Sequence, residues 1–164
     1  MNIEILQPRP WDLVGSTILI AGNAVAFEGH LTIRVSEGHA EYTGTAAAGA
    51  TSIRPFQGSV TIPPGPAFML NRLFVTVTDD SGGGDGGTPP TVVVPVLYGP
   101  MILDGYAGYW QHTVASGETL SSIARDYFEG DASQYTVIHQ ANQHIISNPD
   151  LIVPGQVLRI PRTA

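Results

Sequence analysis

The sequence holds five histidines, and their spacing decides whether they could bind a metal ion. His139 and His144 are five positions apart, about 140° round a helix, so one helical face cannot present both to a single ion. His30, His39 and His112 fall in separate segments, and no His-Glu-x-x-His pattern occurs. Cysteine is absent, which removes thiolate ligands as well. We therefore predict packing or surface histidines and no metal site.

The residue patterns of hydrolytic catalysis are missing. No serine lies in a Gly-x-Ser-x-Gly elbow. A glycan-cleaving pair of carboxylates could be formed among Glu28, Glu37 and Glu41, but their spacing does not favour it. The sequence therefore predicts a non-catalytic binding protein that needs no cofactor.

A glycine-rich stretch over residues 79–90 carries three aspartates, Asp79, Asp80 and Asp85. Carboxylates in such a stretch resemble a calcium-binding turn. A solvated hairpin tip is the favoured interpretation, because a run of apolar and β-branched residues follows it directly.

The charge balance excludes several kinds of partner. The formal net charge is −7, with 14 acidic and 7 basic residues, so the chain lacks the basic surface that nucleic acids or anionic membranes require. The amino terminus has no secretion signal, and no apolar run reaches the roughly 20 residues that span a bilayer. We expect no nucleic acid and no membrane insertion. The chain as given is expected in the cytoplasm or on a particle, and in the cell envelope if it is exported or trimmed.

The first hundred residues predict a β-sandwich. Leu31, Ile33 and Val35 alternate with polar residues, as in a strand with one buried face. Similar short runs, separated by glycine and proline, are Ile3–Leu6, Thr17–Ala24, Phe56–Ile62, Leu73–Thr78 and Thr91–Leu97, with a weaker one over Glu41–Thr45. Repeated short strands without a helical period indicate an all-β, immunoglobulin-like sandwich over residues 1–99.

The hydrophobic period changes after a predicted linker over residues 100–110. Leu120, Ile123, Ala124 and Tyr127 have the i, i+3, i+4, i+7 spacing of one helical face, and Thr119 is a plausible N-cap. A second helix is expected from residue 131 and a strand over 157–160. Residues 111–164 are thus predicted to form a small α+β module with the order strand, helix, helix, strand.

This module resembles a LysM domain. The stretch from His112 to Ala124 resembles the opening of that family, and the stretch from Asn148 to Pro161 resembles its close. The resemblance implies a βααβ fold that binds N-acetylglucosamine polymers, chiefly peptidoglycan or chitin, between two loops. The glycan-binding residues it implies are Gly117, Glu118, Thr119, Leu120, Asn148, Pro149, Asp150, Leu151 and Ile152.

Structural roles compete with glycan binding at these positions. Gly117 could serve only a turn, and Leu120 and Ile152 could be core residues. Glu118 stands where the family has aspartate, and Val153 where many members have an aromatic or polar residue. The single copy and its long middle segment also resemble modules of cytoplasmic bacterial proteins and of phage-tail or contractile-injection baseplates. A protein assembly is therefore the alternative partner.

The amino-terminal region resembles the immunoglobulin-like domain of bacterial spore-germination proteins. The resemblance rests on the stretch from Gly22 to Gly29, the run Leu31–Val35 and Phe56. It implies an interaction module without catalytic residues. The two resemblances together predict an adaptor in which the sandwich is a spacer or a protein-binding domain.

Overall fold

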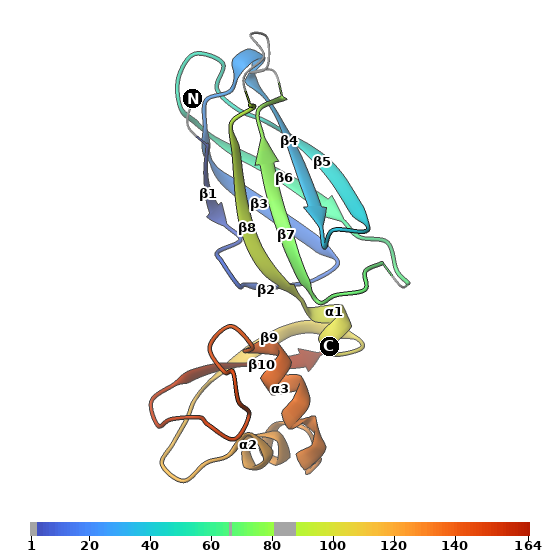
Figure 1. Ribbon diagram of the computed structural model, residues 1–164, viewed down its shortest axis with the longest axis vertical. Coiled ribbons are helices and arrows are strands. Elements are labelled where there is room, and N and C mark those ends of the chain that lie inside the picture. The colour runs from blue at the N-terminus through green and yellow to red at the C-terminus, as the bar shows by residue number, and fades with distance from the viewer. Residues whose placement is uncertain (1–2, 66, 81–87) are drawn as a thin grey trace. The chain divides into compact units, whose positions relative to one another are not determined.

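The computed structural model describes residues 3–65, 67–80 and 88–164, and the chain forms two compact units (Figure 1). The first unit ends at Tyr98 and the second begins at Gly99. Of the residues described, no helix combines the length and the apolar character needed to cross a bilayer.

The first unit is a sandwich of two β-sheets, which confirms the predicted fold class (Figure 1). One sheet has the strand order β1 (Ile3–Gln7), β3 (Thr17–Ala24) and β6 (Arg54–Thr61). The other has the order β2 (Leu13–Val14), β8 (Thr91–Tyr98), β7 (Arg72–Thr78), β4 (His30–Ser36) and β5 (Glu41–Ala47). A short 3-10 helix, η1 (Phe27–Gly29), leads into β4.

The alternating residues of β4 form the centre of this sandwich. Leu31, Ile33 and Val35 are completely buried. In the antiparallel register of β4 and β7, Ile33 pairs with Val77 and Val35 with Val75. Because side chains along a strand alternate between its two faces, this register puts every one of these apolar residues on the inner face.

Two glycines allow β5 and β6, which belong to different sheets, to approach each other closely. A Cβ atom on Gly44 would lie 2.4 Å from the carbonyl oxygen of Ser59, and one on Gly58 would lie 2.9 Å from the carbonyl oxygen of Thr45. Only glycine fits such close backbone contacts. The absence of side chains here lets the two sheets meet along one edge of the sandwich.

The second unit has a two-stranded sheet and, between its two strands, three helical segments that pack around a small core. Antiparallel strands β9 (Tyr106–Thr113) and β10 (Val157–Thr163) flank α2 (Leu120–Tyr127), the 3-10 helix η3 (Ala132–Gln134) and α3 (Tyr135–Ala141). The Thr119 hydroxyl accepts a hydrogen bond from the Ser122 amide at 3.1 Å, which confirms the predicted N-cap. Asp131 caps η3, and the α-helix begins only at Tyr135.

The segment 100–110, expected as a linker, holds the end of α1 (Gly99–Ile102) and the first half of β9. Two glycines of this segment have different environments. Gly105 adopts a left-handed conformation before the strand, whereas Gly108 lies inside it and pairs with Arg162 of β10. A glycine tolerates both environments, so its presence alone did not mark the start of the strand.

Asn142 connects α3 to β10. Its amide nitrogen donates to the carbonyl oxygens of Ile138 and Arg159, both at 2.7 Å, and its side-chain oxygen accepts from the Arg159 amide at 2.9 Å. The residue is completely buried. This side chain therefore bonds backbone groups and holds the last helix on the last strand.

The close approach of β5 to β6 makes Gly44 a sensitive position. We expect Gly44→Ala to destabilise the first unit by about 1–3 kcal/mol, because the added methyl group must displace a backbone carbonyl. Urea unfolding followed by circular dichroism measures this loss. Gly15→Ala is the matched control, since no atom lies within 4 Å of its added Cβ. Equal stability of the two variants would contradict the packing argument.

Candidate functional site

A groove of about 360 Å³ lies between two loops of the second unit. The first loop joins β9 to α2, and the second leads from α3 to β10. The groove is lined by Glu118, Thr119, Leu120, Ser121, Tyr135, Pro149, Asp150 and Ile152. Six residues proposed from the sequence therefore surround one hollow, although they come from segments about 30 positions apart.

The floor of the groove is apolar and continuous with the core. Leu120 is only 2% exposed and belongs to the buried cluster, while Ile152 and Tyr135 pack against that cluster and are partly open to solvent. Core packing and groove lining are thus performed by the same side chains. The two interpretations of Leu120 and Ile152 that the sequence left open are compatible.

Glu118 holds the first loop in place. One of its carboxylate oxygens accepts the Ala115 amide at 2.7 Å and lies 2.8 Å from Nε2 of His112 on β9. The other ring nitrogen of His112 lies 3.2 Å from the hydroxyl of Tyr127 on α2. These contacts join the loop to the strand before it and the helix after it. Bonding to Ala115 and then to His112 lowers the pKa of Glu118.

Local hydrogen bonds also shape the second loop. The side-chain oxygen of Asn148 accepts the Asp150 amide at 3.0 Å, and the Asn148 carbonyl accepts the Leu151 amide at the same distance. The Gly155 amide donates to the Val114 carbonyl at 2.8 Å, and this bond fastens the second loop to the start of the first. The separation of the loops, and so the width of the groove, depends on this connection.

Three of the proposed residues do not line the groove. Gly117 has a φ of 85°, a left-handed conformation that favours glycine in the turn. The side chain of Asn148 accepts a hydrogen bond within the second loop. Leu151 is 71% exposed and lies outside the hollow. The turn residues support the loops that carry the lining residues.

Sequence reasoning missed two lining residues, Ser121 and Tyr135. Tyr135 packs against the core of the unit. Since it is the first residue of α3, its ring also reaches the groove at that end of the helix. Ser121 follows the helix cap, a position with no distinctive sequence signal.

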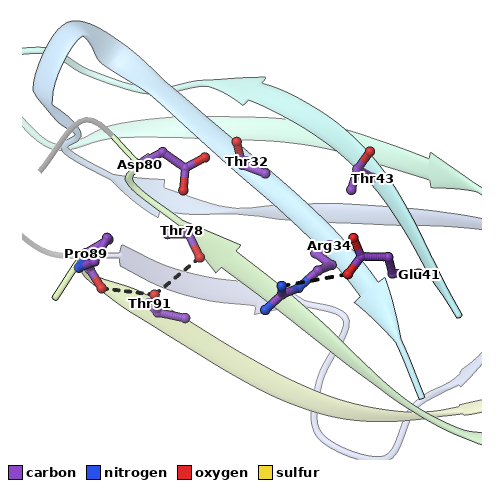
Figure 2. Close-up of a pocket in the computed structure, with 8 residues that line it drawn as sticks. All are labelled: Thr32, Arg34, Glu41, Thr43, Thr78, Asp80, Pro89 and Thr91. Atoms are coloured by element: carbon purple, nitrogen blue, oxygen red, sulfur yellow. Dashed lines mark hydrogen bonds and ion pairs between the residues drawn. The ribbon is translucent and has the colours of Figure 1, made fainter. Parts of the chain in front are cut away.

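A second hollow, of about 390 Å³, lies on the first unit beside β4, β5, β7 and β8 (Figure 2). Four threonines, Pro89 and Asp80 line it, together with an ion pair between Arg34 and Glu41 at 3.8 Å. Both charged side chains are more than half exposed, so the pair contributes little stability. None of the eight residues that the structure describes around this hollow is aromatic.

Two further candidate residues, Asp79 and His139, have structural partners. The buried carboxylate of Asp79 accepts the Phe27 amide at 3.0 Å, and Asp85 lies outside the described residues. Nε2 of His139 lies 3.0 Å from the Ile146 carbonyl oxygen. Across residues 3–65, 67–80 and 88–164, no three histidine, aspartate or glutamate side chains come together as metal ligands could.

The Glu118 contacts predict how the first loop responds to acid. A lowered pKa means that the folded state favours the charged carboxylate, so its stabilising effect is present above the pKa of unfolded glutamate. That effect is lost as the pH falls through the lower, folded value. We expect the Ala115 amide resonance to titrate with a midpoint below the usual glutamate range. NMR spectroscopy tests this, with Glu118→Gln as the non-titrating control; a midpoint at or above the usual range would refute it.

Comparison with known proteins identifies both units. Residues 2–84 match the immunoglobulin-like domain of bacterial spore germination, Gmad2, and residues 112–161 match the LysM domain. Relatives include the potassium binding protein Kbp of Escherichia coli O6:H1, 50% identical over 50 residues, and an uncharacterized protein of Deinococcus radiodurans, 54% identical over 50 residues. Each match covers 30% of this chain, and they cover 33% and 19% of the respective relatives. No solved structure matches.

The chain thus spans a third or less of these curated relatives, while the first family match covers half of the chain itself. LysM domains in general bind glycans such as peptidoglycan, and both domain types are typically non-catalytic binding modules. The chain belongs to the family that carries the immunoglobulin-like domain of bacterial spore germination, here followed by a LysM domain.

Proposed function

We propose that the LysM groove binds an N-acetylglucosamine-containing glycan, peptidoglycan or a chitin-like polymer, without catalysis. One observation carries this proposal. Two loops joined by the Gly155–Val114 hydrogen bond enclose an open hollow whose floor is apolar and whose rims are polar. Ligand sites commonly combine such an apolar surface with a few well-placed polar groups.

The lining chemistry suits an acetamido sugar. The methyl group of an acetamide can pack on Leu120 and Ile152, while loop backbone groups and the Thr119 hydroxyl can bond its polar atoms. The ring of Tyr135 offers an aromatic surface to a pyranose ring. In this proposal Gly117 and Asn148 shape the loops, and Leu151 contacts the polymer beyond the groove.

Affinity for one sugar chain is expected to be weak, because a single shallow groove buries little of a polymer. Tight retention then needs a second anchor, since linked sites raise the effective concentration of each other's ligand. We propose that the immunoglobulin-like unit supplies a spacer or a protein-binding surface. The protein would thereby act as an adaptor between a glycan and a protein.

An alternative function is suggested by the exposed apolar residues outside the groove. Leu151 is 71% exposed, Val153 is 62% exposed, and Val157 at the start of β10 is half exposed. Apolar residues gathered in one segment are typical of protein interfaces. In this alternative the LysM module docks onto a larger assembly of the phage-tail or contractile-injection baseplate type.

Ile152→Ala tests the glycan proposal. We expect this variant to bind chitin oligosaccharides about 5- to 10-fold more weakly, because it removes apolar surface from the groove floor. Isothermal titration calorimetry measures the affinity, and sedimentation with purified cell walls provides a second readout. Val153→Ala is the matched control, since Val153 lies on the same loop outside the groove. If the folded natural protein binds neither chitin nor cell walls, the proposal fails.

Leu151→Asp with Val153→Asp tests the assembly alternative. Charge on these exposed positions should abolish a stoichiometric protein complex isolated from the source cell, because burying an unpaired carboxylate is unfavourable. Cross-linking mass spectrometry should place the partner on this loop in the natural protein. Failure to recover any stable complex would remove the alternative and leave the glycan proposal intact.

A further inference from the structure

Both loops contribute a carboxylate to the groove. Glu118 lies on the first loop and Asp150 on the second, so negative charge is present on opposite sides of the hollow. None of the eight residues that the structure places along the groove is a lysine or an arginine. The Glu118 carboxylate does contact a histidine, His112, at 2.8 Å, but that residue is not part of the groove lining.

The basic residues of the LysM unit lie elsewhere. Its three arginines are outnumbered by six acidic residues. Arg125 is in the last turn of α2, Arg159 stacks over the Tyr109 ring, and Arg162 stacks over the Trp110 ring. Arg159 and Arg162 are therefore on the β9–β10 sheet, and Arg125 is at the opposite end of α2 from its Thr119 cap.

The amino terminus of α2 offsets only part of this charge. A helix terminus carries about half a positive charge, against two full negative charges on the carboxylates. Glu118 keeps its charge, because the Ala115 amide and His112 stabilise the ionised form. Asp150 is exposed, with its backbone amide held by Asn148. The net potential in the groove is therefore negative.

We propose that the groove selects uncharged runs of N-acetylglucosamine and disfavours glycans that place a carboxylate between the two loops. This inference rests on the proposed glycan function and specifies its substrate class. The disfavoured class includes strands whose muramic acid residues carry a free lactyl carboxylate. The preferred class includes chitin-type oligosaccharides and strands in which that carboxylate is blocked.

Charge is the proposed basis of selection, and steric bulk is the competing one. Two like charges about 4 Å apart repel by about 1 kcal/mol in water, which corresponds to roughly a fivefold change in affinity. Salt weakens such repulsion, because the screening length falls from about 30 Å at 0.01 M to about 10 Å at 0.1 M. A steric clash has no such salt dependence, so the two explanations make different predictions.

Three ligands separate these effects in the intact protein. They are chitotetraose, the N-acetylglucosamine–N-acetylmuramic acid tetrasaccharide with free lactyl carboxylates, and the same tetrasaccharide with each carboxylate converted to its methylamide. In calorimetry at low salt we expect the methylamide to bind about fivefold more tightly than the free acid. This difference should shrink to about twofold or less at about 0.3 M sodium chloride.

Asp150→Asn tests whether the groove itself causes the discrimination. This variant should reduce the methylamide-to-acid affinity ratio to about half or less of its natural value, because it removes one of the two groove charges. Asp126→Asn removes an equal charge from the exposed face of α2, outside the groove, and should leave the ratio unchanged.

Equal affinities of the free acid and the methylamide at low salt would overturn the inference while leaving glycan binding established. A difference that persists at high salt and in Asp150→Asn would also overturn it, in favour of steric exclusion. Failure of all three ligands to bind the folded protein would remove both the inference and the proposed function.

Discussion

The groove depends on two backbone hydrogen bonds that continue the β9–β10 pairing beyond the end of β9. Val114 donates to Gln156 at 2.9 Å and accepts from Gly155 at 2.8 Å, so the two loops leave the sheet at a fixed separation. Backbone bonds of this kind do not depend on the side chains of the lining residues. The groove can therefore present different side chains on a constant frame.

A small core explains why several groove residues have two functions. The cluster of the LysM unit contains only eight fully buried apolar residues, with a few partly buried neighbours. A core of this size leaves little separation between the interior and the binding surface. Leu120, Ile152 and Tyr135 accordingly belong to both, and changes at these positions affect stability and binding together.

Glu118 combines a positioning role with an electrostatic one. Its carboxylate fixes the loop through Ala115 and His112 and also adds negative charge to the groove lining. An aspartate, one methylene shorter, would have to reach the strand differently. The departure from the family's usual residue is thus connected to both the shape and the charge of the site.

The first unit has a steric constraint of its own at Gly44 and Gly58, where the close approach of two strands excludes any side chain.

The sequence by itself determined most of the elements of this protein, because they follow from local periodicity and capping. The alternation over Leu31–Val35 and the i, i+3, i+4, i+7 spacing from Leu120 each correspond to an element of the structure, as does the Thr119 cap. The resemblance of the sequence to the LysM family also identified six of the residues that line the groove. Tertiary structure alone decided that Tyr135 and Ser121 join the groove, that Gly108 lies inside a strand, and that Glu118 reaches His112. These features depend on contacts between separate structural elements, which periodicity cannot supply.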